Sequence, residues 1–236
     1  MSNNYFNFKQ FRINQEKAAF KVGTDGVLLG TYSFTEGAEN ILDIGTGTGL
    51  VAIMLAQRSN AKITAIEPDH ESYLQACENV AACPWSDRIT VIETNVQSFK
   101  DDMGRFDLIV TNPPYFVDSL KNPDPRKSSA RHNDSFTADD LLKGVSRMLK
   151  TEGHLQIILP YVEGNIFIAE AAGYGLYCND ILKIKPLPSS EIRRLILRFG
   201  KFQLKPSESF LTIEHGSRHD FTEDYINLTK DFYLKF

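Results

Sequence analysis

The chain has 236 residues, of which 42% are hydrophobic and 24% are charged, and its formal net charge is −4. These values are typical of one soluble globular domain spanning residues 1–236. No apolar stretch is long enough to cross a membrane and no signal-peptide core is found, so we expect neither a membrane-spanning nor a secreted protein. The three cysteines lack metal or redox spacing and the five histidines are scattered, so we expect reduced thiols, a cytoplasmic protein and no metal.

Strand and helix patterns alternate along the chain. Strands are expected at 40–44, 62–67, 88–92, 106–111, 153–159, 175–185 and 192–200, and helices at 48–58, 69–82, 137–149 and 163–172. This rhythm predicts a doubly wound, Rossmann-like α/β sheet. The last two of these strands are joined by too few residues for a crossover helix, so they should be antiparallel.

Three further local patterns complete this prediction. Apolar and polar residues alternate in 6–13, which predicts a short hairpin at the edge of a ligand pocket. Thr137 and Asp140 have the spacing of a helix N-cap, and they predict the start of the helix at 137–149. In the tail, we expect a strand at 210–214 and a helix at 222–233 that packs on the body of the protein.

A glycine-rich turn follows the expected strand at 40–44. Gly45, Gly47 and Gly49 alternate with threonines, and glycine at such a turn lets a ligand approach the backbone. Leu50 stands where a dinucleotide-binding fingerprint has its last glycine, so the turn is a poor pyrophosphate cradle. Asp43 places a carboxylate beside the turn, which favours a ligand with an ammonium or sulfonium charge over a phosphate.

Glu67 ends the next strand, about twenty residues beyond the glycines, where an acid binds the two hydroxyls of a ribose. An alternative for the turn and this acid together is a generic Rossmann-like turn with an acidic surface residue. The motif that follows the strand at 106–111 favours a ligand site.

That motif is Asn-Pro-Pro-Tyr at 112–115. The carboxyl ends of strands are where an open α/β sheet holds its ligands. The Asn112 side-chain oxygen and the Pro113 carbonyl are two acceptors, and Tyr115 adds a flat aromatic face. Together they suit a planar amino group such as the exocyclic NH2 of adenine, whereas the alternative is a proline turn that only ends the strand.

Four segments, 21–30, 43–49, 112–116 and 130–132, carry a family resemblance. The two motifs resemble class I S-adenosylmethionine-dependent methyltransferases, and the whole chain is similar to the bacterial tRNA1(Val) (adenine-37-N6)-methyltransferase family. The resemblance implies a seven-stranded sheet with an antiparallel terminal strand. It also implies S-adenosylmethionine as the cofactor and adenine 37 in the anticodon loop of a tRNA as the substrate.

The resemblance also implies roles for individual residues. The N-terminal segment 1–36 would close over the cofactor, with Thr24 and Asp25 at its methionine end and Asp25 facing the ammonium. An alternative for these two residues is a plain turn before a helix. Asn95 and Val96 would hold the cofactor's adenine. The catalytic residues would be Asn112, Pro113, Pro114 and Tyr115.

The segment 117–136 is long and polar, and loops of this length in compact domains are usually functional or disordered. We expect it to be a substrate loop over the target base, with Phe116 as a second wall of the base pocket. Arg126, Arg131 and His132 would bind the RNA, because arginine matches phosphate with two parallel hydrogen bonds. The alternative is a solvated loop with incidental charges.

A second basic run extends from 183 to 205, where the arginines alternate with apolar residues in an expected strand. RNA contacts and a plain solvent-facing strand remain equal alternatives for it.

Two other functions remain open. The motif at 112–115 also serves enzymes that methylate a glutamine amide of release factors or a guanine of ribosomal RNA. Release-factor enzymes carry a separate N-terminal helical domain, whereas only about forty residues precede the glycine turn here. The other function is that of a non-catalytic RNA-binding relative, which the intact motifs disfavour.

Overall fold

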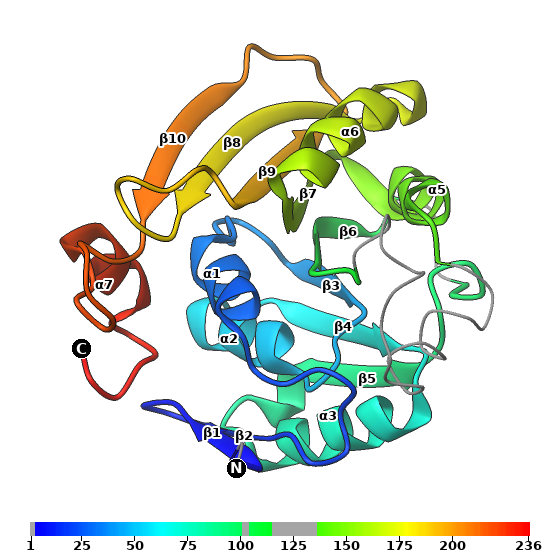
Figure 1. The fold of residues 1–236 in the computed structure, drawn as a ribbon. Coiled ribbons are helices and arrows are strands. Elements are labelled where there is room, and N and C mark those ends of the chain that lie inside the picture. The colour runs from blue at the N-terminus through cyan, green and yellow to red at the C-terminus, as the bar shows by residue number, and fades with distance from the viewer. Residues whose placement is uncertain (1–2, 101–103, 115–135) are drawn as a thin grey trace.

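The computed structural model describes residues 3–100, 104–114 and 136–236. Its main feature is a twisted sheet of eight strands in the order β10-β8-β9-β7-β6-β3-β4-β5 (Figure 1). The strands are β3 (Asn40–Ile44), β4 (Lys62–Glu67), β5 (Ile89–Glu93), β6 (Phe106–Thr111), β7 (Leu149–Pro160), β8 (Tyr177–Lys185), β9 (Arg194–Gly200) and β10 (Ser207–Thr212). Only β9 runs antiparallel to its neighbours, β7 and β8.

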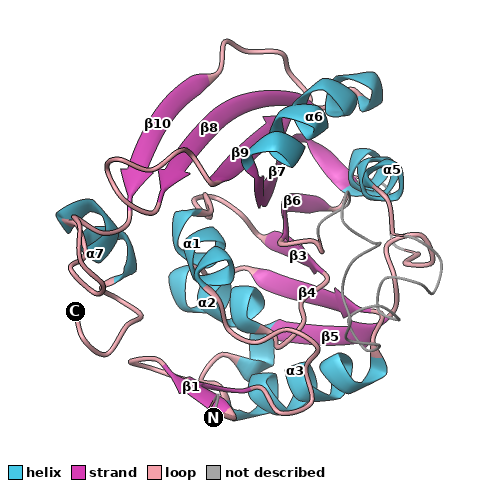
Figure 2. Ribbon diagram, in the orientation of Figure 1, coloured by secondary structure: helices cyan, strands magenta, loops and turns pink. Residues whose placement is uncertain are grey.

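Helices cover both faces of this sheet (Figure 2). One face packs on α1 (Thr24–Tyr32), α2 (Leu50–Arg58), α3 (His70–Ala82) and α7 (Glu223–Thr229). The other face packs on α5 (Ala138–Met148) and α6 (Tyr161–Ala171), and short 3-10 helices lie at Ser86–Arg88 and Ala172–Tyr174. The two apolar cores alternate along a strand: Ile41 belongs to the first and Leu42 to the second. Among the described helices, none combines the length and the apolar character needed to cross a membrane.

The predicted doubly wound sheet is confirmed, and so is the antiparallel pairing of its last two predicted strands. Ile181 of β8 lies opposite Leu197 of β9. The sheet has eight strands rather than seven, because β10 pairs in parallel with the free edge of β8, with Phe210 opposite Lys183. An extra strand satisfies backbone groups that an edge strand leaves unpaired.

The helix α1 was not predicted, since we expected no helix before residue 48. It contains Gly26 and Gly30, which disfavour a helix by local propensity. Their purpose is close packing: a Cβ on Gly30 would lie 2.7 Å from Met54 Sδ, and one on Gly26 would lie 3.1 Å from Leu50 Cδ2. Contact with α2 therefore outweighs the local preference.

The capping pattern that predicted the start of α5 is confirmed. The hydroxyl oxygen of Thr137 accepts the Asp140 N–H at 3.1 Å, and the Asp140 carboxylate accepts the Thr137 N–H at the same distance. This reciprocal pair satisfies two N–H groups that a helix start otherwise leaves without partners.

The predicted N-terminal hairpin is confirmed as β1 (Tyr5–Asn7) and β2 (Arg12–Asn14). It packs on the C-terminal residues, far along the chain. The Lys9 N–H donates to the Phe232 carbonyl at 2.8 Å, and the rings of Phe8 and Tyr233 stack at 6.0 Å. The two ends of the chain thus form one structural unit (Figure 1).

Candidate active site

A cleft of about 750 Å³ lies at the carboxyl ends of β3, β4 and β6. Most of the predicted cofactor residues line it, together with the first three residues of the 112–115 motif. These predicted residues are Thr24, Asp25, Asp43, Gly45, Gly47, Glu67, Asn95, Val96, Asn112, Pro113 and Pro114. Gly49 does not line the cleft, and neither does the hairpin at 5–14, whose expected place at the pocket edge was wrong. Residues 19–26 form that edge instead.

The glycine turn has the backbone geometry that the sequence predicts. Gly45, Gly47 and Gly49 have φ angles of +71°, +56° and +82°, which side-chain-bearing residues rarely adopt. A Cβ on Gly45 or Gly47 would meet no atom within 4 Å, so their bare backbone faces open space. Gly49 serves a different purpose, since it is the N-cap of α2 in the left-handed conformation.

Asp43 stabilises this turn through buried hydrogen bonds. Its side chain is only 2% exposed, and one carboxylate oxygen accepts the Thr46 hydroxyl at 2.6 Å and the Ala52 N–H at 3.2 Å. Burial raises the pKa of Asp43 to about 6. Asp43 thus holds the turn to the start of α2, in addition to placing charge beside the cleft.

Glu67 links the turn to the next strand end. Oε2 accepts the Gly47 N–H at 2.8 Å and Oε1 accepts the Asp69 N–H at 3.0 Å. Burial raises the pKa of Glu67 to about 7, although both hydrogen bonds oppose the shift. Each oxygen retains a further lone pair, so the carboxylate can still accept two ligand hydroxyls.

Asn95 and Val96 lie at the far end of the cleft, beyond β5. The Asn95 side-chain oxygen already accepts the Ser98 N–H at 2.8 Å. This bond occupies the oxygen that we expected to accept from an adenine amino group, which leaves one lone pair for a ligand. The Val96 side chain is 2% exposed and packs closely on α5. Its Cγ2 lies 2.5 Å from the position that a Cβ on Gly144 would occupy, so only glycine fits there.

Asn112 stands at the opposite end of the cleft. Just before it, the Thr111 hydroxyl donates to the Ile44 carbonyl at 2.8 Å, which ties the end of β6 to the end of β3. The Asn112 side chain is exposed and its amide nitrogen lies 4.0 Å from where a Cβ on Gly26 would stand. Pro113 is buried, so its backbone is held firmly. The start of α1 therefore reaches the same edge as the motif.

Asp25 lines the cleft as one partner of an ion pair with Arg194. Arg194 Nε donates to its carboxylate at 2.8 Å, from 169 residues away at the start of β9. The sequence placed Arg194 in a basic run with a solvent-facing strand as the alternative. In the structure it ties α1 to the sheet beside the cleft, so much of the negative charge of Asp25 is already balanced.

Two aromatic wall residues of the cleft were not assigned a role from the sequence. Phe20 precedes the segment 21–30 and is 46% exposed, and Phe136 is the last residue of the expected substrate loop. An aromatic residue beside a glycine-rich segment was the available signal for Phe20. The remaining predicted site residues lie outside the described residues: Tyr115, Phe116, Arg126, Arg131 and His132.

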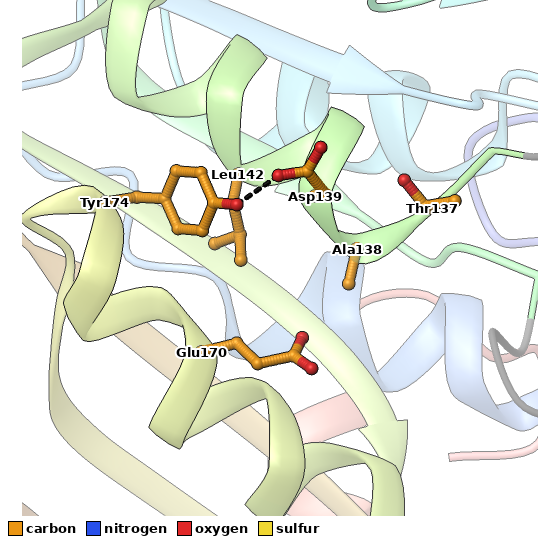
Figure 3. A pocket seen from close by; sticks show the side chains of 6 residues that line it. All are labelled: Thr137, Ala138, Asp139, Leu142, Glu170 and Tyr174. Atoms are coloured by element: carbon orange, nitrogen blue, oxygen red, sulfur yellow. Dashed lines mark hydrogen bonds between the residues drawn. The ribbon is translucent and has the colours of Figure 1, made fainter.

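A second hollow of about 410 Å³ lies between α5 and α6 (Figure 3). Its acidic side chains are Asp139 and Glu170, and the hydroxyl of Tyr174 donates to Asp139. Asp139 also accepts from Lys143 at 2.7 Å, so its charge is balanced on its own helix. The glycine turn and the strand-end acceptors belong to the larger cleft, where we place the active site.

Residues 23–161 match the methyltransferase small domain family. The chain belongs to this family. The tRNA1(Val) (adenine(37)-N6)-methyltransferase of Phocaeicola vulgatus is 47% identical over 235 residues, which are 99% of each chain. The enzyme of the same name from Parabacteroides distasonis is 43% identical over 237 residues and the full length of both chains.

The fold is also found in solved methyltransferase structures. A predicted O-methyltransferase from Agrobacterium tumefaciens superposes with a TM-score of 0.66 at 22% identity, covering 88% of this chain and 96% of that one. The family resemblance expected from the motifs is confirmed, and so is the enzyme class, a methyltransferase.

Proposed function

We propose that this protein transfers a methyl group from S-adenosylmethionine to the exocyclic N6 of an adenine in tRNA. The substrate that fits best is adenine 37 in the anticodon loop of tRNA1(Val), on which the relatives named above act. One observation carries this proposal. A single cleft brings together the glycine turn, Glu67 and the acceptors of Asn112 and Pro113. From the tRNA substrate we also infer a cytoplasmic protein.

The residues that line the cleft fit S-adenosylmethionine. Glu67 would accept the two ribose hydroxyls, and the bare backbone of Gly45 and Gly47 would let the ligand lie close to the turn. The Val96 N–H would donate to a ring nitrogen of the cofactor's adenine. The part of segment 1–36 that would close over the methionine end is 19–26, because these residues line the cleft.

The reacting amine is held by its two hydrogens. The N6 lone pair of adenine is delocalised into the ring, so the amine is a weak nucleophile. Acceptance of both hydrogens by Asn112 Oδ1 and the Pro113 carbonyl favours a tetrahedral nitrogen with its lone pair on one side. The cofactor would supply a sulfonium methyl group to this lone pair, with the N–C bond forming as the C–S bond breaks, and Asn112 and Pro113 would hold the nitrogen in position.

Charge and protons balance without a dedicated base. The positive charge moves from sulfur to the methylated nitrogen, which then loses one proton to water. The cofactor supplies the methyl group, and the protein supplies position and two acceptors. Tyr115 would stack on the base, and the segment 117–136 would cover it as a substrate loop, with Phe116, Arg126, Arg131 and His132 on the RNA.

The proposal is tested by methyl transfer from labelled S-adenosylmethionine to total bacterial tRNA, followed by nucleoside mass spectrometry. We expect N6-methyladenosine to rise in valine tRNA only. Label in ribosomal RNA or a release factor, with none in tRNA, would keep the chemistry and replace the substrate. Cofactor binding without transfer to any of these would instead favour a non-catalytic RNA-binding protein.

A further inference from the structure

The N-terminal end of α6 leaves an apolar surface uncovered. Tyr161, Val162 and Ile166 are 42%, 67% and 47% exposed. The opposite side of the helix packs on the sheet through Gly164 and Phe167, which are both buried. A cluster of exposed large apolar side chains is uncommon on a protein surface unless it contacts a partner.

This surface is continuous with the edge of the active-site cleft. The Tyr161 N–H donates to the Arg193 carbonyl at 3.2 Å, which fixes the first turn of α6 beside Arg193. The next residue, Arg194, donates to Asp25 at 2.8 Å, and Asp25 lines the cleft together with Asn112. Two hydrogen bonds and the peptide link between Arg193 and Arg194 thus connect the cleft residue Asp25 to Tyr161.

The chemistry of this surface matches single-stranded RNA. Arg193 is exposed, and its guanidinium forms no ion pair within the described part of the chain. The hydroxyl of Tyr161 likewise has no hydrogen-bond partner among the described residues. The backbone contact places these two residues next to each other, and their exposed side chains offer a ring for stacking on a base and a guanidinium with two donors for a phosphate. Glu191 is the one exposed acid in the strand connection before Arg193.

We propose that Tyr161, Val162, Ile166 and Arg193, here called the Tyr161 surface, bind the nucleotides next to the target base. Tyr161 stacks on a neighbouring base and Arg193 contacts the adjoining phosphate. The inference rests on the proposed function. When the target adenine enters the cleft beside Asn112, its neighbours in the strand remain outside, within reach of this edge. The occupant is therefore the same RNA strand that supplies the methylated base.

The test compares Tyr161→Ala, Tyr161→Phe and Arg193→Gln with the wild type. The substrate is an anticodon stem-loop RNA, and the readouts are its Kd, the KM and kcat of methyl transfer, and the Kd of the cofactor. Phe202→Ala and Lys62→Gln are matched controls, since Phe202 is exposed in the loop beyond the other end of β9 and Lys62 is exposed at the amino end of β4. Thermal unfolding of each variant checks that it is folded.

We expect Tyr161→Ala to weaken RNA binding and raise KM by roughly five- to hundredfold, as loss of one base stack does. The kcat, the cofactor Kd and the control variants should stay unchanged, and Tyr161→Phe should retain binding because it keeps the ring. Arg193→Gln should reduce the slope of log Kd against log salt by about one.

Other results separate this inference from the function on which it rests. Unchanged RNA affinity in both Tyr161→Ala and Arg193→Gln would overturn the Tyr161 surface while leaving methyl transfer intact. The same unchanged affinity together with a concentration-dependent dimer that Tyr161→Ala abolishes would assign the surface to a second copy. RNA binding that Tyr161→Ala weakens, in a wild type that methylates no RNA, would keep the surface and overturn the proposed chemistry.

Discussion

Two carboxylic acids of the cleft have pKa values well above the usual range of exposed acids. Asp43 and Glu67 lie among apolar strand ends, and burial raises their pKa values to about 6 and about 7. Between about pH 4.5 and pH 7, Glu67 is protonated in the folded protein but ionised in the unfolded chain. This group therefore lowers the stability of the cofactor-free protein as the pH rises from about 4.5 to about 7.

The ionised form of Glu67 is the one that accepts ribose hydroxyls. We therefore expect cofactor affinity to rise roughly tenfold between about pH 6 and pH 8, as a single group with a pKa near 7 ionises. Calorimetry across this range should show a weaker and flatter profile for Glu67→Gln. An identical rise in the variant would assign the titration to another group or to the ligand's amine.

Asn112 acts on the reacting nitrogen rather than on the cofactor. Asn112→Ala should bind the cofactor with normal affinity and lose at least about a hundredfold in kcat, because the lost acceptor is needed most in the transition state. Asn112→Asp keeps an acceptor and should lose less, whereas Asn227→Ala, exposed on α7, is a control. Near-normal turnover in Asn112→Ala would refute the mechanism, whatever its RNA substrate.

At the level of elements, the packing of α1 on α2 decides where the cleft edge lies. Gly30 is buried against Met54. A Cβ atom added at Gly30 would lie 3.0 Å from the Met54 Cβ, which is too close for an ordinary van der Waals contact. We expect Gly30→Val to lower the free energy of unfolding by about 1–3 kcal/mol through overpacking. Urea unfolding measures this change.

The matched control for Gly30 is Gly173→Val, at a position in a 3-10 helix where an added Cβ meets nothing within 4 Å. Its stability should change little. An equal loss in both variants would mean that bulk at Gly30 is tolerated and that backbone effects alone determine the result.

For the whole molecule, the C-terminal residues hold the N-terminal hairpin in place. Phe232 is 2% exposed in the same core as Phe8 and Phe11. Phe232→Ala should lower the free energy of unfolding by about 3–5 kcal/mol and expose the hairpin to limited proteolysis. Leu234→Ala, at a side chain 61% exposed, should change neither. If the hairpin stayed protected in Phe232→Ala, the two ends would be stable independently.

Much of the sheet and of the cleft was predictable, because the signals are local. A buried strand, a turn of alternating glycines and a helix follow one another within a few residues, as do the strand β6 and the motif at 112–115. The edges were less predictable. Helix α1 depends on glycines that contradict its local propensity, and the eighth strand depends on a free edge of β8.

The sequence by itself determined the turn geometry at Gly45 and Gly47 and the placement of acids and acceptors at strand ends. Backbone sterics and strand alternation act over consecutive residues, so their effects can be predicted from the local sequence. Only the tertiary structure decided that Arg194 balances Asp25 and that Tyr161 lies on the same edge as Asn112. Such contacts join residues far apart in the chain, and they depend on how elements pack rather than on what each segment prefers.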